Sequence, residues 1–233
     1  KKGTEVRLTV KRMDGSIQVV PIKRDVVEIE ETFAKSAIIK SKDNKYGIIN
    51  LPTFYVNFKD VRERNSASDM ALEIAKLKKE NVDGLIVDLR NNGGGSLAKV
   101  VEIAGLFIKD GPVVQVRDAN GNVQILHDTD RGLQWDKPLI ILINELSASA
   151  SEILAAAMQD YGRAIILGSK QSYGKGTVQE LIDLNREVRN SSLGDLGAIK
   201  LTRQKFYRIN GGSTQLKGVN SDIVIPDRYQ YIK

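Results

Sequence analysis

Apolar and polar residues alternate near both ends of the chain, with the period that predicts half-buried β-strands. Residues 5–10 and 16–22 alternate on either side of the turn signal Asp14-Gly15, so the chain is predicted to begin with a β-hairpin. Alternation over residues 198–207 predicts a long strand near the other end, and further strands are expected from Thr177 onward.

The middle of the chain has a different pattern, in which short apolar runs are separated by segments of helical spacing. Continuous apolar runs are typical of buried parallel strands, and they occur at residues 84–89, 138–143 and 164–167. Apolar residues at steps of three and four predict helices over residues 66–80, 96–107 and 151–161, the first of them capped by Ser66 or Ser68. Extended segments are also expected over residues 27–40 and 46–51. This order predicts an α/β core with a parallel sheet.

Composition excludes several classes of site. The 233 residues contain no Cys and one His, His127, so cysteine nucleophiles, Cys-ligated metals and multi-histidine metal sites are excluded. Hydrophobic residues make up 41% and charged residues 27%, which favours a packed core. The net charge of +6 comes without a long Lys/Arg block, and no run approaches the ~18 apolar residues of a membrane span.

Three serines alternate with alanines just before the third predicted helix, in Ser147-Ala-Ser-Ala-Ser-Glu152. A serine at the start of a helix lies beside backbone N–H groups that can hold an oxyanion, so the segment is a candidate nucleophile site. The alternative is a helix N-cap, for which one serine would suffice, with Glu152 placed at the positive end of the helix.

A nucleophilic serine needs a base, and the single histidine lies in a polar segment rich in turn residues. Lys175, between Gly174 and Gly176, is the preferred candidate because Ser-Lys pairs are an alternative to the Ser-His-Asp triad. An ordinary lysine is protonated at neutral pH, so a lysine base needs a desolvated or electropositive setting. Gln179 lies on the same face four residues later and can orient the amine. The alternative is a turn lysine in solvent.

Three motifs together resemble the S41 serine peptidases, the C-terminal processing or tail-specific proteases, and their Prc-like branch in particular. These are Asp88-Leu-Arg-Asn-Asn-Gly-Gly-Gly95, the serine segment from Ser147 to Glu152, and Tyr173-Gly-Lys-Gly-Thr-Val-Gln179, in the order found in that family. Residues 155–163 and 204–214 also resemble that branch, so the likeness covers most of the chain.

The resemblance assigns a role to each matching residue. It implies that Ser149 is the nucleophile, that Lys175 is its base, and that Gln179 supports the lysine. It also implies an oxyanion hole made by the N–H groups of Gly95 and Ala150. Neither a metal nor an organic cofactor is expected.

The resemblance further implies a fold and a setting. Residues 29–233 are expected to form a ClpP/crotonase-like α/β peptidase core with flanking β-strands, and residues 1–28 to be the last strands of an incomplete PDZ domain. Expected substrates are proteins or peptides with unstructured, apolar C-termini in the periplasm or cell envelope, with peripheral association with the membrane or an adaptor allowed. Because a PDZ groove captures a C-terminus by strand addition, the chain is expected to cleave weakly without a whole PDZ domain.

Three other classes of function share single features with this sequence. Crotonase-like acyl-CoA enzymes also use glycine-turn oxyanion holes, but they give the serine and lysine motifs no role. A non-catalytic peptide-binding scaffold would tolerate loss of the dyad, yet every dyad residue is present. Nucleic-acid binding is the weakest alternative, because the basic residues form no tail.

Overall fold

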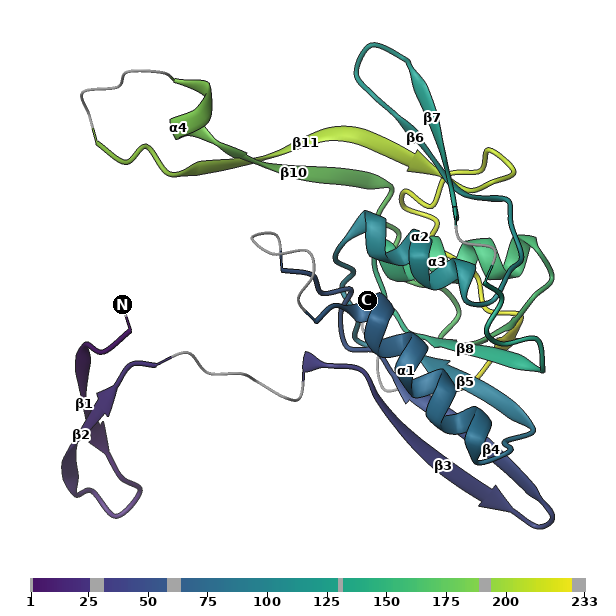
Figure 1. Cartoon of the computed structure of the whole chain (residues 1–233). Helices are drawn as coiled ribbons and strands as arrows, with labels where there is room; N and C mark the ends of the chain where they lie inside the picture. Colours follow the sequence, from purple (N-terminus) through teal and green to yellow (C-terminus); the bar gives the residue numbers. More distant parts are fainter. Residues whose placement is uncertain (1, 26–31, 58–63, 130–131, 189–193, 228–233) are drawn as a thin grey trace. The chain divides into compact units, whose positions relative to one another are not determined.

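The computed structural model describes residues 2–25, 32–57, 64–129, 132–188 and 194–227. The chain divides into two compact units, Lys1–Glu31 and Thr32–Lys233 (Figure 1). The sequence predicts a boundary after residue 28, and that position lies outside the described residues.

The first unit is an antiparallel hairpin of β1 (Glu5–Lys11) and β2 (Ile17–Lys23), which confirms the alternating pattern. Its turn is closed by Asp14, whose side chain accepts a hydrogen bond from the Ser16 amide at 2.9 Å. A two-stranded hairpin has no second layer to cover its apolar side chains, so Leu8 and Val19 stay about half exposed.

The second unit is built on a six-stranded sheet with the order β12-β9-β8-β5-β4-β3. Its strands are β3 (Lys35–Ser41), β4 (Asn44–Asn50), β5 (Gly84–Asp88), β8 (Leu139–Ile143), β9 (Ile165–Gly168) and β12 (Ile223–Val224). Neighbouring strands from β4 to β12 run parallel, and β3 joins the edge antiparallel to β4. The three apolar runs of the sequence therefore form the adjacent strands β5, β8 and β9, as predicted.

Helices α1 (Ser66–Lys79), α2 (Leu97–Gly105) and α3 (Ala150–Asp160) lie on the same face of this sheet (Figure 1). The apolar stripe predicted for α1 is buried, with Met70, Ile74 and Leu77 at most 2% exposed. None of the helices within the described ranges is long and apolar enough to cross a membrane.

The cap predicted for α1 is wrong by one residue. Asn65, rather than Ser66 or Ser68, is the N-cap, and its side chain accepts hydrogen bonds from the amides of Ala67 and Ser68. Ser68 completes a capping box by accepting from the Asn65 amide. Asparagine caps a helix as well as serine does, and the fully buried Ser66 is the first helical residue instead.

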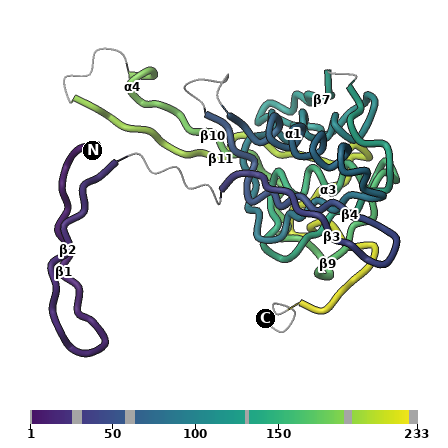
Figure 2. Tube along the Cα trace, turned by 60° about the horizontal axis from the view of Figure 1, so that its bottom comes forward, coloured from purple at the N-terminus to yellow at the C-terminus, as the bar shows by residue number. Residues whose placement is uncertain are grey.

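A second, antiparallel sheet has the order β10-β11-β6-β7. It contains β6 (Pro112–Arg117), β7 (Val123–His127), β10 (Thr177–Asp183) and β11 (Ala198–Tyr207), with the short helix α4 (Leu184–Glu187) after β10. Strands β10 and β11 form a long two-stranded arm that Figures 1 and 2 both show. The expected strands beyond Thr177 are thereby confirmed.

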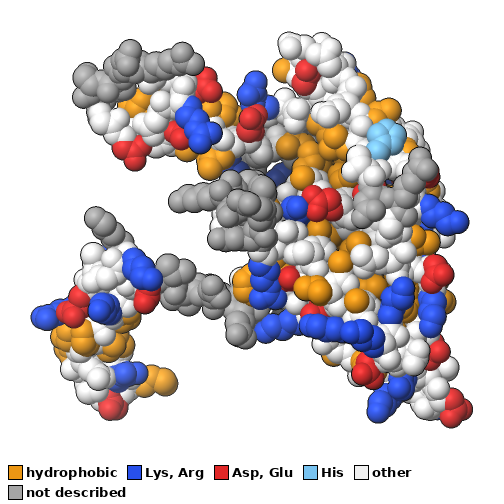
Figure 3. All heavy atoms as spheres, in the orientation of Figure 1, with side chains coloured by type: hydrophobic (Ala, Val, Ile, Leu, Met, Phe, Trp, Pro, Cys, Tyr) orange, Lys and Arg blue, Asp and Glu red, His pale blue; other side chains and the backbone are white. Residues whose placement is uncertain are grey.

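The segment around His127 is not the turn-rich region that the sequence suggested. His127 ends the edge strand β7, where it pairs with Pro112 of β6, and it is exposed to solvent (pale blue in Figure 3). Polar residues are tolerated in β7 because an edge strand of a small sheet has little to pack against.

Candidate active site

The loop between β8 and α3 turns sharply at Ser149. This residue is the N-cap of α3 and has φ 58° and ψ −112°, a backbone conformation that costs about 1–3 kcal/mol and is kept only where neighbouring structure fixes it. Gly94 packs directly against it, since a Cβ at that glycine would lie 2.8 Å from Cβ of Ser149 and 2.9 Å from the Ala148 carbonyl oxygen. The backbone conformation of Ser149 therefore depends on a glycine at position 94, because any side chain there would clash with the serine loop.

The three serines of this loop differ in what their hydroxyl groups do. The Ser147 hydroxyl donates to the Leu89 carbonyl at 2.8 Å, and the Ser151 hydroxyl donates to the Asn92 carbonyl at 2.8 Å. Both side chains are fully buried, whereas Ser149 is half-buried and lines a cavity. The two outer serines thus hold the loop to the segment after β5, and the middle one is left facing open space.

The glycine turn after β5 places backbone N–H groups beside Ser149. Gly95 must be glycine, because a Cβ there would lie 2.3 Å from the Phe54 carbonyl oxygen. The Gly94 amide is occupied by the Asn92 side chain at 2.9 Å. Within the described part of the chain, the N–H groups of Gly95 and Ala150 donate to no protein atom, so both remain open to a ligand.

The loop before β10 carries the candidate base. Lys175 is half-buried, and its Nζ donates to Oε1 of Gln179 at 3.3 Å. The flanking glycines allow a close approach to another segment: a Cβ at Gly176 would lie 2.8 Å from Cβ of Gln215. Among the described residues, no hydrogen bond joins the Ser149 hydroxyl to the lysine amine, and such contacts often tighten only when substrate binds.

One cavity of about 220 Å³ brings all five predicted site residues together. Its lining combines a hydroxyl, an amine, an amide side chain and two backbone N–H donors with an apolar wall. The lining residues are Gly93, Gly95, Leu97, Ser149, Ala150, Ile153, Lys175, Val178, Gln179, Lys200 and Phe206. These are the groups that acyl transfer through a serine requires. His127 is not among them.

Sequence reasoning gave Glu152 only the role of a charge at the helix end. In the structure this glutamate is fully buried and accepts four hydrogen bonds, from the amides of Ser149, Gly174 and Lys175 and from the Ser172 hydroxyl. Burial raises the pKa of Glu152, and these hydrogen bonds oppose the rise. Its spacing from Ser149 signals a capping box, but nothing in the sequence signals the other three donors.

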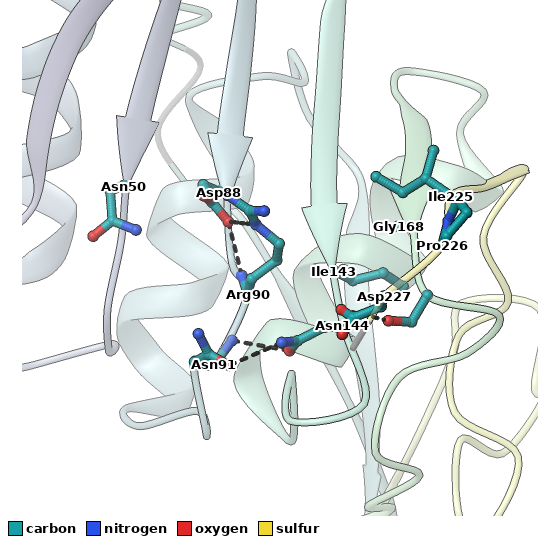
Figure 4. A pocket seen from close by; sticks show the side chains of 11 residues that line it. Asn50, Asp88, Arg90, Asn91, Ile143, Asn144, Gly168, Ile225, Pro226 and Asp227 are labelled. Atoms are coloured by element: carbon teal, nitrogen blue, oxygen red, sulfur yellow. Dashed lines mark hydrogen bonds and ion pairs between the residues drawn. The ribbon is translucent and has the colours of Figure 1, made fainter. Parts of the chain in front are cut away.

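A second, larger cavity of about 520 Å³ lies at the carboxyl ends of the parallel strands (Figure 4). Arg90 donates to both carboxylate oxygens of Asp88 there, at 2.9 and 2.6 Å. Asn144 accepts from the Asn91 amide at 2.9 Å and donates to its side chain at 2.8 Å. The cavity wall therefore braces the glycine turn against the serine loop. Its one lining serine among the described residues, Ser169, donates to the carboxylates of Glu145 and Asp227 at 2.7 and 3.1 Å.

Residues 45–225 match the model of peptidase family S41. The chain therefore belongs to this family of C-terminal processing serine proteases, as the motifs predict. Among the described residues, no three His, Asp or Glu side chains gather where they could hold a metal ion.

Individual relatives agree with this membership. The chain is 45% identical over 228 residues to the tail-specific protease of Haemophilus influenzae. This match covers 97% of the present chain and 31% of the Haemophilus protein. The chain is 33% identical over 239 residues to the carboxy-terminal-processing protease of Bartonella bacilliformis, covering 98% and 49%. The chain thus spans between about a third and a half of the length of these two relatives.

The solved structure of a photosystem II D1 C-terminal processing protease has a similar fold. It aligns with a TM-score of 0.68 at 24% identity, covering 97% of this chain and 56% of that one.

Proposed function

We propose that the protein is a serine endopeptidase that uses a Ser149-Lys175 dyad on a ClpP/crotonase-like core. One observation carries the proposal: the Ser147 and Ser151 hydroxyls are bound to buried carbonyls, and the Ser149 hydroxyl is in the cavity that also holds the lysine. A structural cap would not need three serines with such different environments.

Acylation begins when the Ser149 hydroxyl oxygen attacks the scissile carbonyl carbon and its proton passes to the neutral Nζ of Lys175. The open N–H groups of Gly95 and Ala150 hold the oxyanion of the tetrahedral intermediate. The lysine then returns the proton to the leaving amine, and an acyl-enzyme remains. The side chain of Gln179 accepts a hydrogen bond from Nζ of Lys175, and this bond orients the amine so that the nitrogen lone pair is directed toward Ser149.

Deacylation repeats these steps with water. Lys175 removes a proton from the attacking water, a second tetrahedral intermediate forms in the same oxyanion hole, and the Ser149 oxygen leaves with the proton. The cavity supplies every group that this sequence of steps needs from the chain.

The proposed substrates are proteins with unstructured, apolar C-termini in the bacterial cell envelope. The apolar wall of the cavity, formed by Leu97, Ile153, Val178 and Phe206, suits uncharged side chains beside the scissile bond. We further propose that residues 1–28 are the last strands of a PDZ domain that captures such termini, and the hairpin β1–β2 is compatible with that role.

The test is cleavage of a disordered reporter protein that ends either in apolar residues or in two aspartates. We expect cleavage of the apolar-ended reporter, covalent labelling of Ser149 by a fluorophosphonate, and loss of both in Ser149→Ala. Fluorophosphonate labelling of Ser147 or Ser151 in the folded protein would refute the dyad. Activity that remains in Ser149→Ala would refute it as well. Equal cleavage of both reporters would refute only the substrate preference.

A further inference from the structure

Glu152 is an acidic side chain in the interior with no cationic partner. It is 0% exposed, and none of the described lysines and arginines lies within ion-pair distance of it. A buried carboxylate without a counter-ion is costly unless several donors compensate it, so its presence in the core of the second unit requires a reason.

The donors come from both sides of the candidate dyad. Oε2 accepts from the Ser149 amide at 2.7 Å and from the Lys175 amide at 2.9 Å. Oε1 accepts from the Ser172 hydroxyl and the Gly174 amide, both at 2.7 Å. One carboxylate oxygen therefore bonds to the backbone of the nucleophile and of the base together.

Helix capping explains only one of these bonds. In a capping box, the glutamate at the third helical position accepts from the amide of the N-cap residue, which here is Ser149. The other bonds reach residues 172–175, twenty or more positions along the chain. A cap would also leave the carboxylate near solvent, whereas this one is fully enclosed.

Other hydrogen bonds also hold the lysine loop, but most of them join it to other parts of the chain, such as residues 214–216, and not to the serine segment. Gly176 donates to the Gln215 side chain at 2.8 Å, and the Thr214 hydroxyl donates to the Lys175 carbonyl at 2.8 Å. Among the bonds between described residues, only that of the Tyr173 amide, which donates to the Ser147 carbonyl at 3.0 Å, joins the loop to the serine segment independently of Glu152.

We propose that Glu152 is a positioning residue that sets the distance between the nucleophile and the base, an inference that rests on the proposed dyad. Without its carboxylate, the lysine loop stays attached to residues 214–216 and, through the Tyr173 amide, to Ser147, but it loses its bonds to the side chain at the start of α3. A displacement of about 1 Å between reacting groups is enough to slow catalysis by about 100-fold.

Two variants separate bridging from capping. Glu152→Gln keeps the size of the side chain, but its NH₂ group must face at least one backbone N–H, so part of the bridge is lost. Glu152→Asp keeps the charge and can still cap the helix, but it is one methylene too short to reach the lysine loop. The matched control is Asp222→Asn, because Asp222 accepts from the Ile166 amide and the Gln159 side chain at the opposite end of α3.

The variants are compared in the full protein by kcat, KM, the rate of fluorophosphonate labelling and thermal unfolding. We expect both Glu152 variants to lower kcat and the labelling rate by about 100-fold with KM unchanged. We expect Asp222→Asn to retain wild-type kcat. If Glu152→Gln does not fold, Glu152→Asp decides.

Wild-type kcat in Glu152→Asp would overturn the inference, because capping would then suffice. The inference would also be overturned if the loss of kcat in the Glu152 variants were no larger than the fraction of unfolded protein in each sample. A folded wild-type protein that neither cleaves nor labels would instead refute the dyad itself, and the inference with it.

Discussion

The candidate nucleophile and the candidate base lie in two loops that are held in different ways. The nucleophile loop, residues 144–152, runs from a buried strand directly into a buried helix. It is held both within itself, where Asn144 bonds to Ser147, and by the buried segment after β5. The lysine loop, residues 171–176, is held by residues distant in sequence, among them Val219 and Gln215.

Because of this difference, we expect substitutions in the two loops to affect stability and catalysis to different degrees. The nucleophile loop is part of the core, so changes in its buried serines should lower stability, whereas a change in the Ser149 hydroxyl, which faces the cavity, should lower activity. The lysine loop lies partly at the surface, so changes in its side chains should alter activity while the fold remains. The predictions below test that division, from the largest expected effect to the smallest.

Ser149→Ala should lower kcat by about 10⁴-fold or more, because no other hydroxyl among the described residues lines the cavity. Its melting temperature should stay close to that of the wild type, since the Ser149 hydroxyl supports no buried carbonyl. Reporter cleavage and thermal unfolding measure the two effects. Residual activity at a tenth of the wild-type rate would show that another residue supplies the nucleophile.

Lys175→Arg should be almost as severe, with kcat reduced by about 10³-fold or more, because a guanidinium group cannot give up its proton to act as a base. Cleavage of the reporter protein by the variant and by the wild type at equal concentration measures this loss. Lys170→Arg, in an exposed position of the preceding segment, is the matched control and should retain wild-type activity.

The two loops also differ in how far the sequence predicted them. The nucleophile loop follows from local pattern: an apolar run, small residues and an Ala-rich helix place Ser149 at a helix start. Lys175 and Gln179 also lie where their spacing predicts. Which serine faces the cavity depends on Leu89 and Asn92, more than fifty residues away. In the sequence, Ser149 was singled out by its central place among the three serines and by the family resemblance.

The part that remained hidden consists of long-range contacts. The three donors of Glu152 from residues 172–175 and the close approach of Gly95 to Phe54 join segments that share no local pattern. Strands β6 and β7 were missed. For β7 the reason is its polar residues at a sheet edge, where packing imposes little alternation.

Gln179→Ala should reduce kcat by about tenfold, because the lysine amine loses the acceptor at 3.3 Å that orients it. Gln179 is exposed, so the free energy of unfolding should change by about 0.5 kcal/mol or less. Unchanged kcat would remove the orienting role. A large loss of stability would show that Gln179, at the start of β10, also supports the fold.

Ser147→Ala and Ser151→Ala should reverse that profile, with lower stability and retained activity of the folded protein. Ser147→Ala leaves the buried Asn144 amide without its acceptor and should cost about 2 kcal/mol. Ser151→Ala should cost about 1 kcal/mol, since the Asn92 carbonyl still accepts from the Ala148 amide. Urea denaturation gives the free energies, and a greater loss in Ser151→Ala would contradict this order.

The smallest expected effect is the pH dependence of the carboxylate that joins the loops. Burial raises the pKa of Glu152 above its ordinary value of 4.5, and the bonds it accepts only partly offset that rise. The folded protein therefore keeps this proton to higher pH than the unfolded chain does. The contribution of Glu152 to stability is then complete below pH 4.5 and is lost as pH rises through the raised value.

Glutamine does not titrate, so the unfolding free energy of the wild type minus that of Glu152→Gln should fall as pH rises from 4.5 toward neutrality. Urea denaturation of both proteins at matched pH values measures this difference, and groups that titrate alike in both cancel from it. A difference that grows with pH would mean that the four donors outweigh burial. Glu152 would then stabilise the fold in its ionised form, through its hydrogen bonds to both loops. The lysine loop would in that case be as much a part of the core as the nucleophile loop.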